Sequence, residues 1–155
     1  MLCENENFPS SEAPLRLLCI VSSMDAGGAE TFLMKVFRAL DRKEYMMDFC
    51  VAVERKCFYE DEIASLGGKI YRTVPKSKNP VKSFLKLKGL VKEQKYKYVL
   101  ICNQYALAAL DLLAARFGGA KILAYRANSA SMSIDGRIAG LCHKLLRGFA
   151  MRIPN

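Results

Sequence analysis

The residues with the clearest potential for chemistry form a short glycine-rich segment. Residues 24–31 read Met-Asp-Ala-Gly-Gly-Ala-Glu-Thr, between an apolar run and a helical pattern. A helix N-terminus has free backbone N–H groups and favours an anion, and paired glycines let a ligand approach the backbone closely. Ala26, Gly27 and Gly28 are therefore candidates for binding a phosphate or a sugar. A tight turn between strand and helix explains the same glycines, and that alternative stays open.

The glycine pair fits neither of two common phosphate-binding motifs. A dinucleotide fingerprint needs three spaced glycines, and a Walker loop ends in Gly-Lys-Ser or Gly-Lys-Thr. The segment contains neither pattern. An NAD-dependent oxidoreductase would therefore share only the fold with this chain.

Other polar candidates follow the fourth and fifth apolar runs. Asn103 comes after the fourth run, and Arg126 and Asn128 come after the fifth. They could bind hydroxyl groups or a phosphate, and such residues equally cap helices or bond to loop backbone. The single histidine, His143, has no accompanying nucleophile or carboxylate pattern. The residues by themselves predict no catalytic group and no metal site.

The elements that must position these residues alternate along the chain. We expect strands over 15–21, 47–53, 69–74, 98–102 and 121–125, and helices over 29–41, 60–66, 79–94, 106–117 and 136–151. Five strands separated by helices predict an α/β, Rossmann-like, doubly wound parallel sheet with helices on both faces, in the strand order 3-2-1-4-5. Ligands bind such sheets at the carboxyl ends of the strands where the order reverses. That rule selects the loops at 22–28 and 102–105, with 126–131 bordering them.

Composition indicates a globular intracellular domain. Hydrophobic residues make up 52% of the 155 residues and charged residues 25%, which excludes a disordered chain. Of the six cysteines, Cys19 and Cys50 lie in apolar runs, and no pair has metal-ligand spacing, so we expect no disulfide framework. No signal peptide or membrane-spanning run is visible. We expect residues 1–14 to be a disordered lead and the location to be cytoplasmic.

The net charge of +9 is concentrated in one segment, with eight lysines and one acidic residue between Lys76 and Lys97. One interpretation is a solvated helix face. The other is weak contact with anionic lipids, which would place the protein peripherally on the inner face of the membrane. Nucleic acid is not expected as a partner, because aromatic residues are not interleaved with the lysines.

Several short motifs occur in an order that resembles a known family. They are Gly-Gly-Ala-Glu-Thr-Phe at 27–32, Leu-Asp-Arg at 40–42, Met-Asp-Phe at 47–49, Asp-Glu-Ile at 61–63, Leu-Gly-Gly-Lys-Ile-Tyr at 66–71 and Lys-Asn-Pro at 78–80. Over residues 15–150 the chain resembles retaining glycosyltransferases that act in bacterial capsule, exopolysaccharide and lipopolysaccharide assembly.

The resemblance implies a GT-B architecture, in which two Rossmann-like domains face each other across a cleft. Residues 15–155 would be the N-terminal domain, which binds a glycan or lipid-linked acceptor, and Gly27 and Gly28 would approach the donor diphosphate. The nucleotide sugar is bound mainly by the second domain, which is absent from these 155 residues, so we expect the chain alone to transfer no sugar. No metal or other cofactor is implied.

The chain departs from the family at two places. Relatives usually carry histidines after strands four and five, where this sequence reads Cys-Asn-Gln at 102–104 and Tyr-Arg-Ala-Asn at 125–128. These departures leave an alternative open, a non-catalytic module that binds a glycan or lipid acceptor. The residues do not indicate which sugar or acceptor is used.

Overall fold

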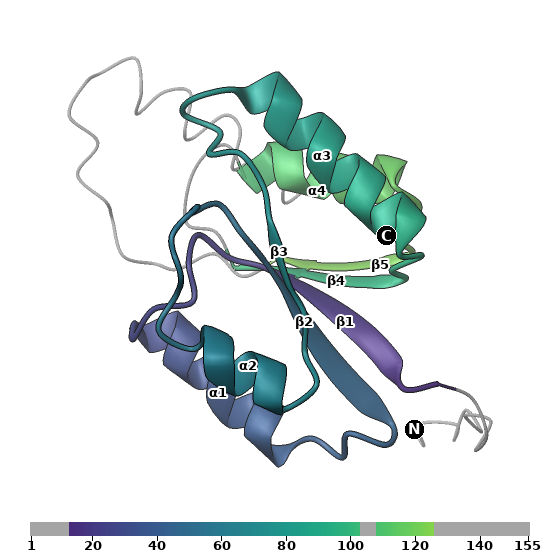
Figure 1. Ribbon diagram of the computed structural model, residues 1–155. Helices are drawn as coiled ribbons and strands as arrows, with labels where there is room; N and C mark the ends of the chain where they lie inside the picture. The colour runs from purple at the N-terminus through teal and green to yellow at the C-terminus, as the bar shows by residue number, and fades with distance from the viewer. Residues whose placement is uncertain (1–12, 103–107, 126–155) are drawn as a thin grey trace.

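The chain forms a single parallel sheet with helices on both sides (Figure 1). The computed structural model describes residues 13–102 and 108–125. In these residues the elements are β1 (Leu15–Ile20), α1 (Gly28–Ala39), β2 (Tyr45–Val51), α2 (Glu60–Ser65), β3 (Ile70–Arg72), α3 (Pro80–Glu93), β4 (Tyr98–Ile101), α4 (Ala108–Phe117) and β5 (Ile122–Tyr125). The expected helix over 136–151 and most of the expected lead over 1–14 lie outside the described residues.

The strand order is β3-β2-β1-β4-β5, and every neighbouring pair is parallel. Helices α1 and α2 cover one face of the sheet, and α3 and α4 cover the other (Figure 1). The predicted Rossmann-like, doubly wound sheet and its order are therefore confirmed. The order reverses between β1 and β4, as expected.

The sheet covers only part of the apolar surface of α1. Leu33, Met34 and Phe37 are the buried residues of α1. Phe32 and Val36, which extend the apolar arc of the helix, are 51% and 36% exposed. The apolar arc of α1 is wider than its contact with the sheet, so only one side of the arc is covered.

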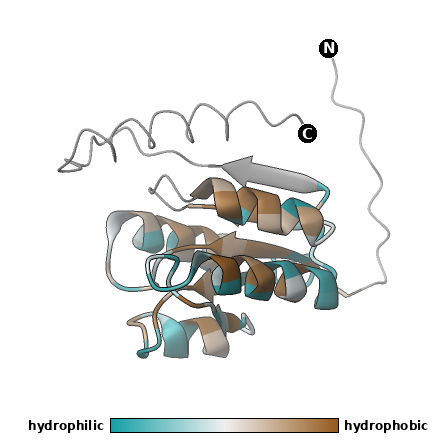
Figure 2. Ribbon diagram, turned by 90° about the horizontal axis from the view of Figure 1, so that it is seen from above, coloured by the Kyte–Doolittle hydropathy of each residue, from teal (hydrophilic) through white to brown (hydrophobic). Residues whose placement is uncertain are grey.

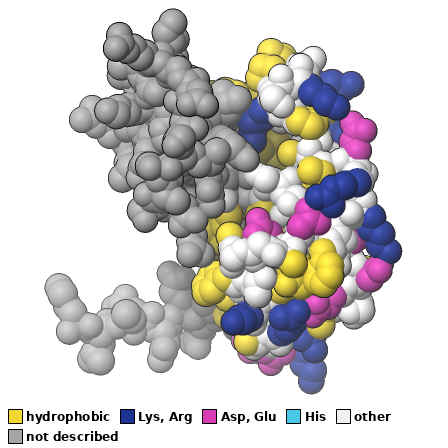
Figure 3. Space-filling view, turned by 90° about the vertical axis from the view of Figure 1, so that its left-hand side faces the viewer, with side chains coloured by type: hydrophobic (Ala, Val, Ile, Leu, Met, Phe, Trp, Pro, Cys, Tyr) yellow, Lys and Arg dark blue, Asp and Glu magenta, His cyan; other side chains and the backbone are white. Residues whose placement is uncertain are grey.

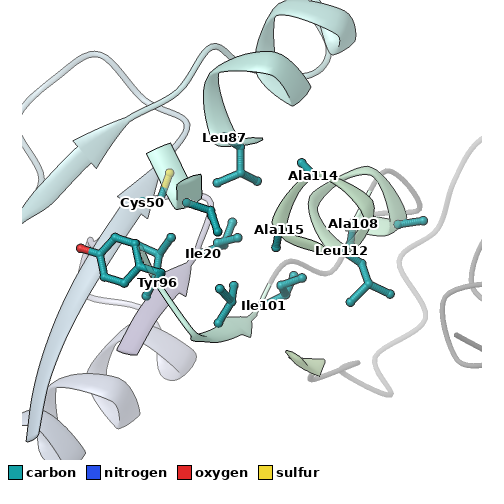
Figure 4. Close-up of a cluster of buried hydrophobic side chains, with 13 residues drawn as sticks. Ile20, Cys50, Leu87, Tyr96, Ile101, Ala108, Leu112, Ala114 and Ala115 are labelled. Carbon is teal, nitrogen blue, oxygen red and sulfur yellow. The ribbon is translucent and has the colours of Figure 1, made fainter. Parts of the chain in front are cut away.

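The core beneath α3 and α4 is built from strand residues and small helix residues (Figure 4). Ile20 and Ile101 from the strands meet Leu87 of α3 and the alanines of α4. Alanine side chains let α4 lie close to its neighbours, and a Cβ on Gly118 would lie only 2.7 Å from the Cβ of Val91. Seen from above, hydrophobic and hydrophilic residues alternate along the helices (Figure 2).

Local signals end and begin the helices as the sequence predicts. After α2, Gly67 has φ +84, and the amide of Gly68 donates to the carbonyl oxygen of Ile63 at 2.9 Å. This left-handed residue is a common helix ending. At the start of α3, the side-chain oxygen of Asn79 accepts a hydrogen bond from the amide of Lys82 at 2.9 Å, and Pro80 occupies the first turn.

A buried carboxylate lies on β2, near the amino ends of β3 and β4. Asp48 of β2 is fully buried and accepts hydrogen bonds from Arg16 Nε at 2.6 Å, from the Lys69 amide at 2.8 Å and from the Tyr96 hydroxyl. Burial raises the pKa of Asp48, but the hydrogen bonds from Arg16, Tyr96 and Lys69 outweigh it and lower the pKa. The carboxylate is therefore ionised and stabilises the sheet.

The cysteines of the described ranges form no disulfide bond. Cys19, Cys50 and Cys57 are buried, and Cys102 is partly exposed. Burial raises the pKa of the Cys50 thiol to about 12 and raises that of Cys19 as well. The buried cysteines therefore act as small apolar side chains, as predicted for Cys19 and Cys50.

Candidate functional site

The glycine segment lies where the strand order reverses. The Cys102 amide donates to the carbonyl oxygen of Ile20 at 2.9 Å, so β1 and β4 remain adjacent to their carboxyl ends. The loop that leaves β1 therefore emerges at the expected binding edge and carries Ala26, Gly27 and Gly28. Asn103, Arg126 and Asn128, the other predicted site residues, lie outside the described residues.

The core and the neighbouring loop hold this segment in place. Met24 is fully buried, and its carbonyl oxygen accepts a hydrogen bond from the Tyr59 amide at 3.0 Å. The Ala52 amide donates to the carbonyl oxygen of Ser22 at 3.1 Å. The loops after β1 and β2 therefore form one connected unit.

Asp25 ties the two loops together through its side chain. Its carboxylate accepts hydrogen bonds from Arg55 Nη1 at 3.0 Å and from the Phe58 amide at 3.2 Å. The hydrogen bond from Arg55, with help from the Phe58 amide and from Ser23, lowers the pKa of Asp25 to about 2. Asp25 is thus ionised at neutral pH. Sequence reasoning missed this pair, because nothing local connects two residues separated by 30 positions.

The backbone at the two glycines does not require glycine. Gly27 caps α1 with φ −101 and ψ 175, which any residue can adopt, and it is followed by Gly28, the first residue of the helix. Gly67 and Gly119 are the glycines with positive φ among the described residues, and neither lies in this loop. A left-handed conformation therefore does not explain the pair, although the chain does turn here, where the Gly27 amide donates to the carbonyl oxygen of Asp25 at 2.8 Å.

What the glycines provide is space. A Cβ on Gly28 would have no neighbour within 4 Å. A Cβ on Gly27 would lie 2.3 Å from Oε2 of Glu30, so the missing side chain leaves room for that carboxylate. Gly28, the residue after Gly27, is exposed. The loop thus presents open backbone next to a carboxylate.

Glu30 alters the chemistry expected at this helix start. It lies in the first turn of α1, where a negative charge is favourable. A carboxylate at this point repels a phosphate and accepts hydrogen bonds from hydroxyl groups. Of the two ligand types considered above, a hydroxylated neutral ligand fits this surface better. The sequence signal was present, because acidic residues commonly occur three positions after a helix cap.

The surrounding charges are already paired. Arg55 forms an ion pair with Asp25, and the Nζ of Lys56 lies 2.7 Å from the Asp61 carboxylate. Figure 3 shows this side of the molecule, where basic and acidic side chains are interspersed. The described part of this face is therefore mixed in charge and does not form a basic pocket.

A separate apolar groove lies at the opposite, amino edge of the sheet. It encloses about 270 Å³ and is lined by residues at the start of three strands and the end of α1, including Leu15, Leu17, Val36, Leu40, Tyr45 and Tyr98. An apolar lining does not suit a hydroxylated or charged ligand. This groove is therefore not the predicted site.

Residues 13–102 and 108–125 contain neither a metal-binding cluster nor a membrane-spanning helix. That part of the chain has no group of three or more histidine, cysteine or acidic side chains placed to hold a metal ion. Within the same ranges, every helix is too short or too polar to cross a bilayer.

Comparison with known proteins finds a similar sequence. The chain is 35% identical over 80 residues to a Bacillus subtilis (strain 168) protein named "Putative glycosyltransferase EpsF". The match covers 50% of this chain and 21% of that protein, so it spans about a fifth of its relative's length. No family model matches the chain. The similarity supports a relation to glycosyltransferases.

Proposed function

We propose that this chain is the acceptor-side, N-terminal domain of a retaining glycosyltransferase with the GT-B architecture. The enzyme would transfer a sugar from a nucleotide sugar to a glycan or lipid-linked acceptor in cell-surface polysaccharide synthesis, in the cytoplasm. A second domain, outside residues 1–155, would hold most of the donor. The similarity to the EpsF protein supports the reaction class, which a Rossmann-like fold alone does not decide.

The observation that carries the proposal is the open backbone at Gly28 beside the Glu30 carboxylate. Both lie at the edge where doubly wound sheets bind ligands. The Gly28 position has no neighbour within 4 Å for an added Cβ, so a sugar ring can contact the backbone there. Glu30 then accepts hydrogen bonds from the hydroxyl groups of the sugar.

The residues around the loop have a positioning role in this proposal. The ion pair between Asp25 and Arg55 fixes the loop relative to β2 and α2. The hydrogen bond from the Tyr59 amide to the carbonyl oxygen of Met24 does the same. The hydroxyls of Thr31 and Tyr59, 3.0 Å apart, join α1 to the same unit. A preorganised loop loses less conformational entropy when it binds a ligand.

Nuclear magnetic resonance titration of the 155-residue chain with glucose, N-acetylglucosamine and lactose tests this proposal. At least one of these sugars should shift the backbone amide signals of residues 26–30. Glu30→Gln should weaken that binding about five-fold, because a hydrogen bond to a charged group contributes about 1 kcal/mol more than a neutral one. Glu93→Gln, the same chemical change on exposed residue 93 of α3, is the matched control.

Two outcomes would contradict the acceptor role. One is the absence of any shift at residues 26–30 with all three sugars. The other is an equal loss of affinity in the Glu30 and Glu93 variants. If the protein that includes the sequence beyond Asn155 binds sugars yet transfers none from UDP-glucose, UDP-N-acetylglucosamine or GDP-mannose, the non-catalytic acceptor-binding module becomes the better assignment.

A further inference from the structure

We propose that the outer surface of α3 and α4 binds an anionic membrane. Apolar side chains enter the lipid interface, and lysines around them contact the headgroups. The α3–α4 surface is defined by Lys78, Val81, Lys82, Leu85, Lys86 and Phe117. This proposal rests on the packing of the two helices and is independent of the ligand at the glycine loop.

The centre of the α3–α4 surface is apolar. Val81 and Leu85, one turn apart on α3, are 67% and 58% exposed. Phe117 of α4 is 65% exposed, and its ring centre lies 6.3 Å from that of Phe84, which packs against the core. The outer face of a surface helix is usually polar. Three large apolar side chains here therefore indicate a contact surface.

The rim of the same surface is basic. Lys82 and Lys86, also one turn apart, follow directly after Val81 and Leu85 on α3, and Lys78 precedes the helix; all three lysines are exposed. Between residues 76 and 92 there is no acidic residue. At the upper end of Figure 3, which corresponds to the α3 side of Figure 1, hydrophobic and basic side chains lie side by side.

Lys76, the first lysine of the basic segment, does not belong to the α3–α4 surface. The Nζ of Lys76 lies 2.7 Å from the Asp111 carboxylate, and their side chains are only 15% and 3% exposed. This pair joins the loop before α3 to α4, so Lys76 cannot contact a membrane. The segment between Lys76 and Lys97 is therefore partly structural and partly surface.

The combination of charge and apolar area favours lipid over the alternatives. A solvated face needs no exposed leucine and phenylalanine within it. A helix that binds in the plane of a membrane interface has apolar residues on one side flanked by lysines. Lys88 lies in the same stripe as Val81 and Leu85, and its long aliphatic stem allows the ammonium group to reach the headgroups.

Sedimentation of the full 155-residue chain with phosphatidylserine vesicles, compared with phosphatidylcholine vesicles, tests the proposal. Binding to phosphatidylserine should fall steeply with added salt, because exposed charges are screened over about 8 Å at physiological ionic strength. Lys82→Gln/Lys86→Gln should weaken binding roughly 25-fold, because each lysine near an anionic surface contributes roughly five-fold. Leu85→Ser/Phe117→Ser should also weaken it and remove the part that persists at high salt. Circular dichroism checks that each variant is folded.

Lys35→Gln/Lys43→Gln is the matched control, because both lysines are exposed in the α1 region, on the other face of the sheet. An equal loss in this control would show that only total charge matters and would overturn the proposal. Equal binding to both vesicle types, or binding to neither, would also overturn it. Soluble polyglutamate is the last arm: if it binds the same residues while vesicles do not, the surface recognises an acidic protein.

Discussion

Replacing Gly28 with alanine separates a structural role from a binding role at the loop. A glycine required for a turn would cost about 1 kcal/mol when replaced. We do not expect this loss of stability for Gly28→Ala. Gly28 is the first helical residue, has no positive φ and has open space at its Cβ position. Alanine favours helix over glycine by up to about 1 kcal/mol, so the variant should be as stable as the parent or slightly more stable.

The effect on binding should be opposite in sign. A sugar that contacts the Gly28 backbone would meet the added methyl group, and inserting a methyl into a filled contact costs about 1–3 kcal/mol. We therefore expect about a ten-fold or greater loss of affinity, since 1.4 kcal/mol is a factor of ten. The assay is the sugar titration described above, combined with the melting temperature of each variant.

Gly89→Ala provides the matched control for this prediction. Gly89 lies within α3, and an added Cβ would lie 3.8 Å from Oε1 of Glu93, an ordinary contact. Both variants should have unchanged or raised melting temperatures, and only Gly28→Ala should lose sugar affinity. Unchanged affinity in Gly28→Ala would refute the binding role of the open backbone. A large fall in its melting temperature would refute the argument that the backbone there is unstrained.

Three other predictions concern particular contacts, and a fourth concerns the two-domain proposal. Gly68→Ala should lower stability by about 1–3 kcal/mol in a thermal melt, because the new Cβ would lie 2.7 Å from the Met47 carbonyl oxygen. Lys76→Ala should lower the free energy of unfolding by up to about 3 kcal/mol in urea, because it removes one partner of a buried ion pair with Asp111. Asp48, whose pKa is lowered in the fold, stabilises the protein above its unfolded pKa of about 3.9 and loses this effect as the pH falls through the folded pKa. Between pH 7 and pH 3, the free energy of unfolding measured in urea should therefore fall less for Asp48→Asn than for the parent protein. Finally, the 155-residue chain should transfer no sugar from UDP-glucose or GDP-mannose to a lipid-linked acceptor in a radiolabel assay, and robust turnover would contradict the two-domain proposal.

The topology could be predicted because the apolar runs are clear and the crossover rule restricts their order. Strand limits were less accurate. β2 begins at Tyr45 and ends at Val51, two residues before each expected limit. The apolar run gave no indication that Asp48 would be buried there, because its partner Arg16 is 32 residues away. The periodicity of apolar residues does not predict a buried charge whose partner is distant in the sequence.

The place of the glycine loop at the switch point could be predicted from sequence, but the side chains around it could not. The switch-point rule and the glycine pair identified Ala26, Gly27 and Gly28 without any coordinates. The rotation of the Glu30 side chain toward Gly27 depends on the exact start of α1. The link from Asp25 to Arg55 depends on how two loops pack. These are tertiary facts, and they are the reason for proposing a hydroxylated ligand in place of a phosphate.

The proposed membrane-binding surface of α3 and α4 extends to the edge of the sheet that carries the glycine loop. Every helix that follows a parallel strand begins at the carboxyl edge of the sheet, so α3 starts at the same edge as the glycine loop (Figure 1). Lys78, Val81 and Lys82 lie in or just before the first turn of α3. A membrane bound at that end of α3 would therefore lie next to the edge that carries Gly28 and Glu30. A lipid-linked acceptor anchored in this membrane would present its sugar close to the loop, whereas a free glycan in solution would gain nothing from the α3–α4 surface.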